Sequence, residues 1–274
     1  MDLTNAILEL IKRISTDLPS DIRILLETAK ESESGTAKQI LTDILENVRI
    51  ARIKGLPMCQ DTGALNFFVR KGDYTEDELK IMIMEATEMA TAQGLLRPNS
   101  VDPISGRNMG NLPIIHFEKG DFEIRLLSKG GGSENVCAQY KLPDASLEAG
   151  RDMEGVEKCI MDAVFKAQGK GCPPYILGVC IGGQRESGYM EAKKQLFRKM
   201  GERGKLAGLE ARLKGKLNSL GIGPMGLGGK TTVLEVFATS LPRLPACYFV
   251  SISINCWALR RWTLTIKDGK PYYS

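Results

Sequence analysis

The chain has 274 residues, of which 43% are hydrophobic and 26% are charged, the balance of an ordinary globular protein that can bury a substantial core. Its formal net charge is only +4, with Lys and Arg interspersed among Asp and Glu, which argues against nucleic-acid binding and suits a small anionic substrate. No secretory leader pattern and no run of about 18 apolar residues is present. We therefore expect a cytoplasmic protein that binds neither nucleic acid nor membrane.

Cysteine and histidine usage narrows the chemistry that the chain can support. The seven cysteines are an odd number, which favours reduced thiols over a disulfide framework. The one histidine, His116, falls in an alternating segment where a structural role is expected. Catalytic zinc sites and hydrolase triads usually need histidine, so thiolate ligation is the more available metal chemistry.

The spacing of apolar residues predicts an α/β fold with a mixed sheet, flanking helices and a helical N-terminal layer. Helices are predicted over residues 3–15, 19–31, 37–54, 76–93, 151–168, 189–200 and 205–219. Strands are predicted over residues 64–69, 114–117, 122–127, 175–181, 231–237 and 249–254, the last being the final strand of the chain. We expect a single domain over residues 1–274, with residues 1–33 as a helical extension.

Two predicted loops carry polar residues suited to substrate binding. Gly55 and Pro57 end the third helix, so Cys59 lies in a constrained loop with Gln60 and Asp61 directly after it. The second is a proline-rich loop that follows the helix over 76–93. That helix begins with a capping box at Thr75 and Glu78.

That proline-rich loop displays one cation, Arg97, between Leu96 and Pro98. The strands over 114–117 and 122–127 then read as a hairpin around a Lys-Gly-Asp turn. After the second of these strands, Gly130–Gly132 either form a flexible turn or bring backbone amides close to an anion.

Two further thiols lie at constrained or terminal positions. Pro173 and Pro174 follow Cys172 and hold it outside regular structure. Cys256 comes directly after the predicted final strand, with Cys247 as a rival at the start of that strand, whereas Cys159 and Cys180 fall inside regular elements and read as core.

The run Gly229-Lys230-Thr231 resembles the end of a phosphate-binding loop, but the pattern fails. Its first glycine position is Pro224, a helix precedes it and a strand follows it. We therefore do not expect nucleotide binding.

Cys59, Cys172 and Cys256 are too widely spaced for a zinc knuckle or a compact ferredoxin motif. Three thiolates that meet in the fold would suit a four-iron cluster with one iron open to substrate, and the alternative is three unrelated reduced cysteines.

Several runs in order along residues 35–262 resemble the iron–sulfur hydro-lyase family of class I fumarases and tartrate dehydratases. They are Cys59-Gln60-Asp61-Thr62-Gly63, Lys129-Gly130-Gly131-Gly132-Ser133-Glu134-Asn135, Gly171-Cys172-Pro173-Pro174, the glycine-rich run 221–231 and Asn255-Cys256-Trp257-Ala258. The second run is more like fumarases, and the ending with Arg260-Arg261 is more like tartrate dehydratases. The length resembles the alpha subunit of a two-component enzyme.

The resemblance implies a role for each of seven residues. Three would ligate a [4Fe-4S] cluster, namely Cys59, Cys172 and Cys256, and four would face a small dicarboxylate, namely Gln60, Asp61, Arg97 and Gly132. Asp61 would also be catalytic, and a beta subunit would complete the site in a hetero-oligomer. The implied reaction is the reversible hydration of fumarate to L-malate, with tartrate dehydration as the alternative and an iron–sulfur or thiol sensor as the non-enzymatic alternative.

The sequence departs from the family pattern at two places. Leu244 stands where family members usually carry histidine, twelve residues before the third cluster cysteine, and the loop around Gly110–Pro113 is one residue shorter than usual. Both departures concern the identity of the substrate and the route of proton transfer more than the binding of the cluster.

Overall fold

A computed structural model describes residues 2–274, and its mixture of helices and mixed sheets confirms the α/β class. The α-helices are α1 (Leu3–Thr16), α2 (Ser20–Ser32), α3 (Gly35–Lys54), α4 (Glu76–Ala92), α5 (Gly131–Asn135), α6 (Met153–Ala167), α7 (Arg185–Gln195) and α8 (Ala207–Asn218). The strands are β1 (Ala64–Arg70), β2 (Ile114–Glu118), β3 (Glu123–Lys129), β4 (Ala138–Lys141), β5 (Tyr175–Gly182), β6 (Val233–Leu241), β7 (Phe249–Asn255), β8 (Arg260–Lys267) and β9 (Lys270–Tyr273). Two short 3-10 helices are η1 (Ala145–Leu147) and η2 (Pro224–Gly226).

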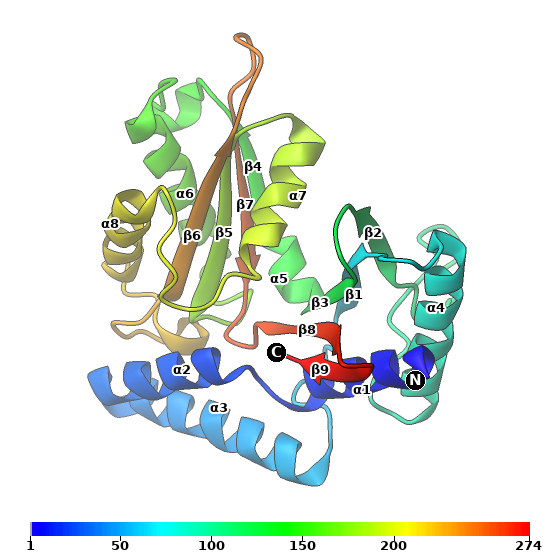
Figure 1. The fold of residues 1–274 in the computed structure, drawn as a ribbon. Helices are drawn as coiled ribbons and strands as arrows, with labels where there is room; N and C mark the ends of the chain where they lie inside the picture. The colour runs from blue at the N-terminus through cyan, green and yellow to red at the C-terminus, as the bar shows by residue number, and fades with distance from the viewer. Residues whose placement is uncertain (1) are drawn as a thin grey trace. The chain divides into compact units, whose positions relative to one another are not determined.

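The strands belong to two sheets, and the residues divide into two compact units (Figure 1). Unit 1 comprises the described part of Met1–Ser20, with Ile44–Gly131 and Leu259–Ser274, and unit 2 comprises Asp21–Asp43 and Gly132–Ala258. The expectation of a single domain over residues 1–274 remains a prediction. No helix of residues 2–274 combines the length and apolar character needed to cross a membrane.

Unit 1 is built on a five-stranded sheet in the order β2-β1-β3-β8-β9. Helices α1 and α4 pack together on this sheet, and their buried apolar side chains form one core with those of β1, β3 and β8. The predicted capping box of α4 is present, since Thr75 Oγ1 accepts from the Glu78 amide and Glu78 Oε2 accepts from the Thr75 amide. Within the predicted extension 1–33, α1 contributes fully buried residues to this core.

The pairing of unit 1 corrects two predictions made from sequence. The expected hairpin of β2 and β3 is wrong, because β1 lies between them and pairs parallel with β2 and antiparallel with β3. The strand over 249–254 is not the last one, since β8 pairs with β3 and β9 pairs with β8. His116 lies in β2, with its ring centroid 5.0 Å from that of Phe68, as expected of a structural residue.

Unit 2 is built on a four-stranded sheet in the order β4-β7-β5-β6 (Figure 1). Helices α6 and α8 cover one face and share its core, while α7 packs on the other face, where Gly178 of β5 lies against the Ala192 carbonyl. The α2–α3 segment is anchored in this unit by two carboxylates. Asp21 Oδ2 accepts from the Met200 amide at 2.9 Å, and Glu33 Oε1 accepts from the Thr231 amide at 2.6 Å.

Candidate active site

The Cys59 loop of unit 1 follows α3, and both backbone polar groups of Met58, the residue before Cys59, are hydrogen-bonded. The Met58 amide donates to the Ser15 carbonyl at 3.0 Å, and Asn47 Nδ2 donates to the Met58 carbonyl at 2.8 Å. Gly55 has a φ of 64°, which is the left-handed conformation that ends a helix. Cys59 is therefore presented, half-buried, from a backbone fixed directly before it, and Gln60 beside it is exposed.

Thr62 is the residue on which the polar contacts of this loop converge. Its Oγ1 accepts from the Arg97 amide at 3.1 Å and from Asn99 Nδ2 at 2.7 Å. Its carbonyl accepts from Ser128 Oγ at 2.6 Å, and Thr62 itself is 2% exposed. The Thr62 hydroxyl thus ties the loop that carries the exposed Arg97 to the loop that carries Asp61.

Asp61 is half-buried and is oriented by neighbours from two other segments of unit 1. Its Oδ1 accepts from the Gly63 amide at 3.1 Å, and its carbonyl accepts from Arg260 Nη2 at 2.9 Å. A Cβ added at Gly130 would lie 2.6 Å from Asp61 Oδ2, closer than real Cβ contacts, so only glycine allows this approach. The first glycine of the 130–132 run therefore makes room for the Asp61 carboxylate.

We use half-site for the predicted site residues within one unit, and Cys172 belongs to the half-site of unit 2. Its backbone φ of 57° is unusual for a residue other than glycine. Its amide donates to the Gly169 carbonyl at 3.1 Å, and its carbonyl accepts from the Trp257 amide at 3.2 Å. The fully buried Tyr175 fixes the turn before it, because its hydroxyl donates to the Gln168 carbonyl and accepts from the Gly171 amide. The left-handed conformation of Cys172 is thus enforced by its surroundings.

The glycine-rich run that resembled a phosphate loop supports the Cys172 turn. The Met225 amide donates to the Pro173 carbonyl at 2.7 Å. A Cβ added at Gly226 would lie 2.5 Å from the Gly169 Cα, and one added at Gly169 would lie 2.9 Å from the Met225 carbonyl oxygen. As expected, a helix precedes this run and a strand follows it. Its glycines allow two backbone segments to touch beneath Cys172.

Cys256 follows β7 and lies beside the Cys172 turn, to which the Trp257–Cys172 hydrogen bond links it within unit 2. Its amide donates to the Ser133 hydroxyl at 3.2 Å. Ser133 belongs to α5, a single helical turn that begins in the glycine run. Gly132, next to Ser133, is exposed and can present its amide to an anion.

The thiols at the three predicted positions fit a metal centre better than the two thiols inside regular elements, Cys159 and Cys180. A metal ligand must be a thiolate, and burial opposes deprotonation. Burial raises the pKa of Cys159 and of Cys180 to about 12, and both are fully buried, which confirms that they are core residues. Cys59, Cys172 and Cys256 are half-buried, form no disulfide and lie outside regular elements, so their chemistry and access suit an iron–sulfur cluster.

The predicted site residues are divided between the two units. Cys59, Gln60, Asp61 and Arg97 belong to unit 1, and Gly132, Cys172 and Cys256 belong to unit 2. Within residues 2–274, no group of three or more His, Cys, Asp or Glu side chains is placed together to hold a metal ion. The three-thiol centre therefore remains a prediction, with two of its thiols in neighbouring loops of unit 2. Leu244 lies in the β6–β7 connection and is exposed.

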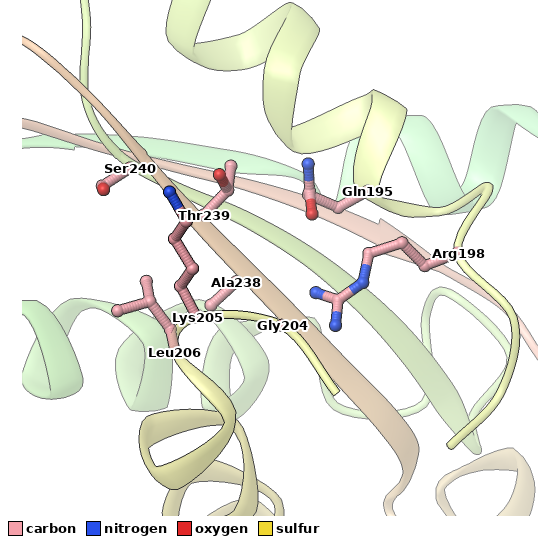
Figure 2. Close-up of a pocket in the computed structure, with 8 residues that line it drawn as sticks. All are labelled: Gln195, Arg198, Gly204, Lys205, Leu206, Ala238, Thr239 and Ser240. Atoms are coloured by element: carbon pink, nitrogen blue, oxygen red, sulfur yellow. The ribbon is translucent and has the colours of Figure 1, made fainter. Parts of the chain in front are cut away.

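A pocket of about 300 Å³ in unit 2 contains none of these residues (Figure 2). It lies along β6 and is lined by Gln195, Arg198, Gly204, Lys205, Leu206, Ala238, Thr239 and Ser240. Arg198, one of the two cations that line it, donates from Nη1 to the buried Glu210 carboxylate at 2.6 Å, and that carboxylate also accepts from the Ala238 amide at 2.8 Å. The Glu210 carboxylate of this ion pair gives the Ala238 amide of β6 an acceptor, so the ion pair has a structural role.

Sequence reasoning missed the residues that support the two half-sites. Thr62 directly follows Asp61 and Ser133 directly follows Gly132, both inside recognised motifs. That position was the available signal that they support the site. Arg260 was noticed only as part of the family-like ending, and its role at Asp61 was not, because the hydrogen bond to the Asp61 carbonyl joins residues 199 positions apart.

Comparison with known proteins agrees with this arrangement of motifs. The model of the fumarate hydratase (Fumerase) family matches residues 4–265. A Geobacillus stearothermophilus protein assigned to class I fumarate hydratases is 42% identical over 94% of the chain, which spans 54% of that protein's length. A Methanocaldococcus jannaschii protein assigned as an L(+)-tartrate dehydratase subunit alpha is 37% identical over 98% of the chain and 100% of its own length.

The L(+)-tartrate dehydratase subunit alpha of Escherichia coli K12 is 34% identical over 96% of the chain and 90% of its own length. These relatives bear the names of two hydro-lyases, and the chain covers the two alpha subunits almost end to end. The family match extends over both units described above. The chain belongs to the fumarate hydratase (Fumerase) family.

Proposed function

We propose that the chain is the alpha subunit of an iron–sulfur hydro-lyase that catalyses the reversible hydration of fumarate to L-malate. The observation that carries the proposal is that each half-site combines a half-buried thiol with groups suited to a dicarboxylate. In unit 1, Cys59 is followed by Gln60 and Asp61. In unit 2, the Cys256 amide donates a hydrogen bond to Ser133, which lies in the helical turn that contains Gly132. The family match supports the same reaction class.

Cys59, Cys172 and Cys256 would hold the cluster, and each is a half-buried cysteine that forms no disulfide. A [4Fe-4S] cluster with three protein thiolates has one iron with an open coordination position, which supplies Lewis-acid chemistry when the cluster is bound. The two fully buried thiols, Cys159 and Cys180, would take no part.

The remaining groups would bind the substrate and handle its proton. Arg97 is exposed, and its planar guanidinium can hold one substrate carboxylate through two hydrogen bonds. The exposed Gly132 amide and the Gln60 side chain can donate to other oxygens of the dicarboxylate. Asp61 has Oδ1 engaged by the Gly63 amide and directs Oδ2 toward Gly130, so Oδ2 is the atom proposed to hold or exchange a proton.

The half-sites also lack groups that a complete dicarboxylate site needs. Arg97 is the only exposed cation placed among the seven predicted residues, and a second carboxylate would need another cationic partner. We propose that a beta subunit supplies it, in a cytoplasmic hetero-oligomer. The names of the two relatives that the chain covers almost completely, each a subunit alpha, support this assembly.

Dehydration of L(+)-tartrate is the second candidate reaction, because those same relatives carry that name. The test is anaerobic reconstitution of the chain with iron and sulfide, addition of the beta partner and assay with fumarate, L-malate and L(+)-tartrate. Turnover of fumarate and malate is expected. Turnover of tartrate alone would favour the second candidate, and a cluster without turnover of any of the three would favour a sensor.

A further inference from the structure

Ser133 connects Gly132, which is proposed to face the substrate, with Cys256, which is proposed to bind the cluster. It is 3% exposed, and its hydroxyl accepts from the Cys256 amide at 3.2 Å. Gly132, the residue directly before it, is exposed in the same helical turn. One side chain therefore joins the backbone of Cys256 to the turn that carries the Gly132 amide.

Cys137 fixes the same turn through a second set of hydrogen bonds. Its thiol donates to the Ser133 carbonyl at 3.1 Å and accepts from the Ile254 amide at 3.2 Å. The end of β7 is thus attached to the α5 region at two points, through Ile254 to Cys137 and through Cys256 to Ser133. A single contact would allow rotation about it, whereas two contacts fix both position and direction.

The Cys256 amide needs a side-chain acceptor because the strand ends before it. The register of β7 against β5 runs from Val250 to Asn255, and Cys256 lies beyond the last pair. A backbone N–H that leaves a sheet in a largely buried region must find another partner. The Ser133 hydroxyl provides that partner in the middle of the proposed ligand loop.

We propose that Ser133 is a positioning residue that fixes the Cys256 thiolate relative to the Gly132 amide. It acts through the Cys256 backbone and touches neither iron nor substrate. This inference rests on the proposed function, since it assigns Ser133 a purpose only if Cys256 is a cluster ligand. Cys137 supports it by holding the Ser133 carbonyl.

The test uses the full chain, reconstituted anaerobically with iron and sulfide, and compares three variants. Ser133→Ala removes the acceptor, and Ser133→Thr restores a hydroxyl. Ser253→Ala is the matched control, because Ser253 is fully buried in β7 and its Oγ has no hydrogen-bond partner among residues 2–274. Each is measured by the rate of iron loss to an external chelator, by the electron paramagnetic resonance spectrum of the reduced cluster and by thermal unfolding.

Iron loss about tenfold faster is expected for Ser133→Ala, the size expected when one largely buried donor loses its acceptor. Its spectrum should shift, while Ser133→Thr and Ser253→Ala should resemble the wild type. Equal iron loss from Ser133→Ala and the wild type would overturn the inference, as would equally fast loss from Ser253→Ala. A wild-type chain that takes up no iron would overturn the proposed function, whereas a loaded wild type with an unaffected Ser133→Ala contradicts the Ser133 inference alone. If Ser133→Thr unfolds early, Ser133→Ala and Ser253→Ala decide the matter by themselves.

Discussion

The two half-sites are held by different physical means. In unit 1, the Asp61 loop is fixed by side-chain hydrogen bonds, most of them converging on Thr62. In unit 2, the Cys172 turn is fixed by backbone segments in direct contact, with Gly226 against Gly169 and with Cys172 itself in a left-handed conformation. We therefore expect the contacts of Thr62 to be sensitive to a lost hydrogen-bonding group, and the contact between Gly226 and Gly169 to be sensitive to added volume.

The largest effect is expected at Asp61 in the first half. Asp61→Asn keeps an oxygen to accept from the Gly63 amide but removes the carboxylate that is proposed to exchange a proton. We expect a loss of kcat of roughly 10²–10⁴-fold, the range of general acid–base catalysis, with the iron content unchanged. Kinetics and iron analysis of the same preparation check both points. A variant with normal kcat would remove Asp61 from the proposed chemistry.

The second half provides a matched pair of glycines for a test of added volume. Gly226 and Gly228 both have positive φ, but only at Gly226 would a new Cβ meet backbone, 2.5 Å from the Gly169 Cα. Gly228→Ala should lower the free energy of unfolding by about 1 kcal/mol through its conformation alone. Gly226→Ala should lower it by about 3 kcal/mol, since overpacking adds to that cost, and should also speed iron loss. Equal values in denaturant titrations would contradict the packing argument.

Thr62 tests the hydrogen-bonded half directly. Thr62→Val keeps the side-chain shape but leaves the Arg97 amide and Asn99 Nδ2 without their acceptor. We expect KM for the dicarboxylate to rise about tenfold, because each lost hydrogen bond is worth about 1 kcal/mol and the Arg97 loop loosens. Thr62→Ser, which retains the hydroxyl, should stay within about threefold of the wild type. A normal KM for Thr62→Val would show that Arg97 is positioned by other contacts.

The smallest and cheapest test concerns thiol reactivity as a function of pH. Burial raises the pKa of Cys159 and Cys180 to about 12, so both remain protonated at pH 8 and their alkylation should begin only as the pH approaches that value. The half-buried Cys59, Cys172 and Cys256 should be alkylated before these two buried thiols in the cluster-free chain. Mass spectrometry of labelled peptides reports the order. Labelling of Cys180 at the rate of Cys59 would contradict the distinction between core and site thiols.

Local sequence signals predicted most elements of the fold but not their pairing. Periodicity placed the helices and most strands within a few residues, because each signal lies inside one segment. The hairpin prediction failed because β1, some 45 residues before β2, occupies the position between β2 and β3. Strand order depends on contacts that are distant in sequence, and adjacent alternating segments do not reveal a strand inserted between them.

The site shows the same division between local and distant information. Motif resemblance proposed Cys59, Asp61 and Cys172 as site residues, because each lies inside a short recognisable motif. Their supports came from elsewhere in the chain, as with Arg260 at the Asp61 carbonyl. The glycine-rich run 221–231 could be excluded as a phosphate loop from sequence, but its contact with Gly169 became visible only in the structure.

The central claim is the proposal that Cys59, Cys172 and Cys256 hold one cluster. Its most direct test is the iron and sulfide content per chain after anaerobic reconstitution of the wild type and of Cys59→Ala, Cys172→Ala and Cys256→Ala, with Cys180→Ala as a buried control. The account predicts about four irons for the wild type and the control, and less than about a tenth of that for each ligand variant. Full iron content in any one of those three variants, or none in the wild type, would contradict it.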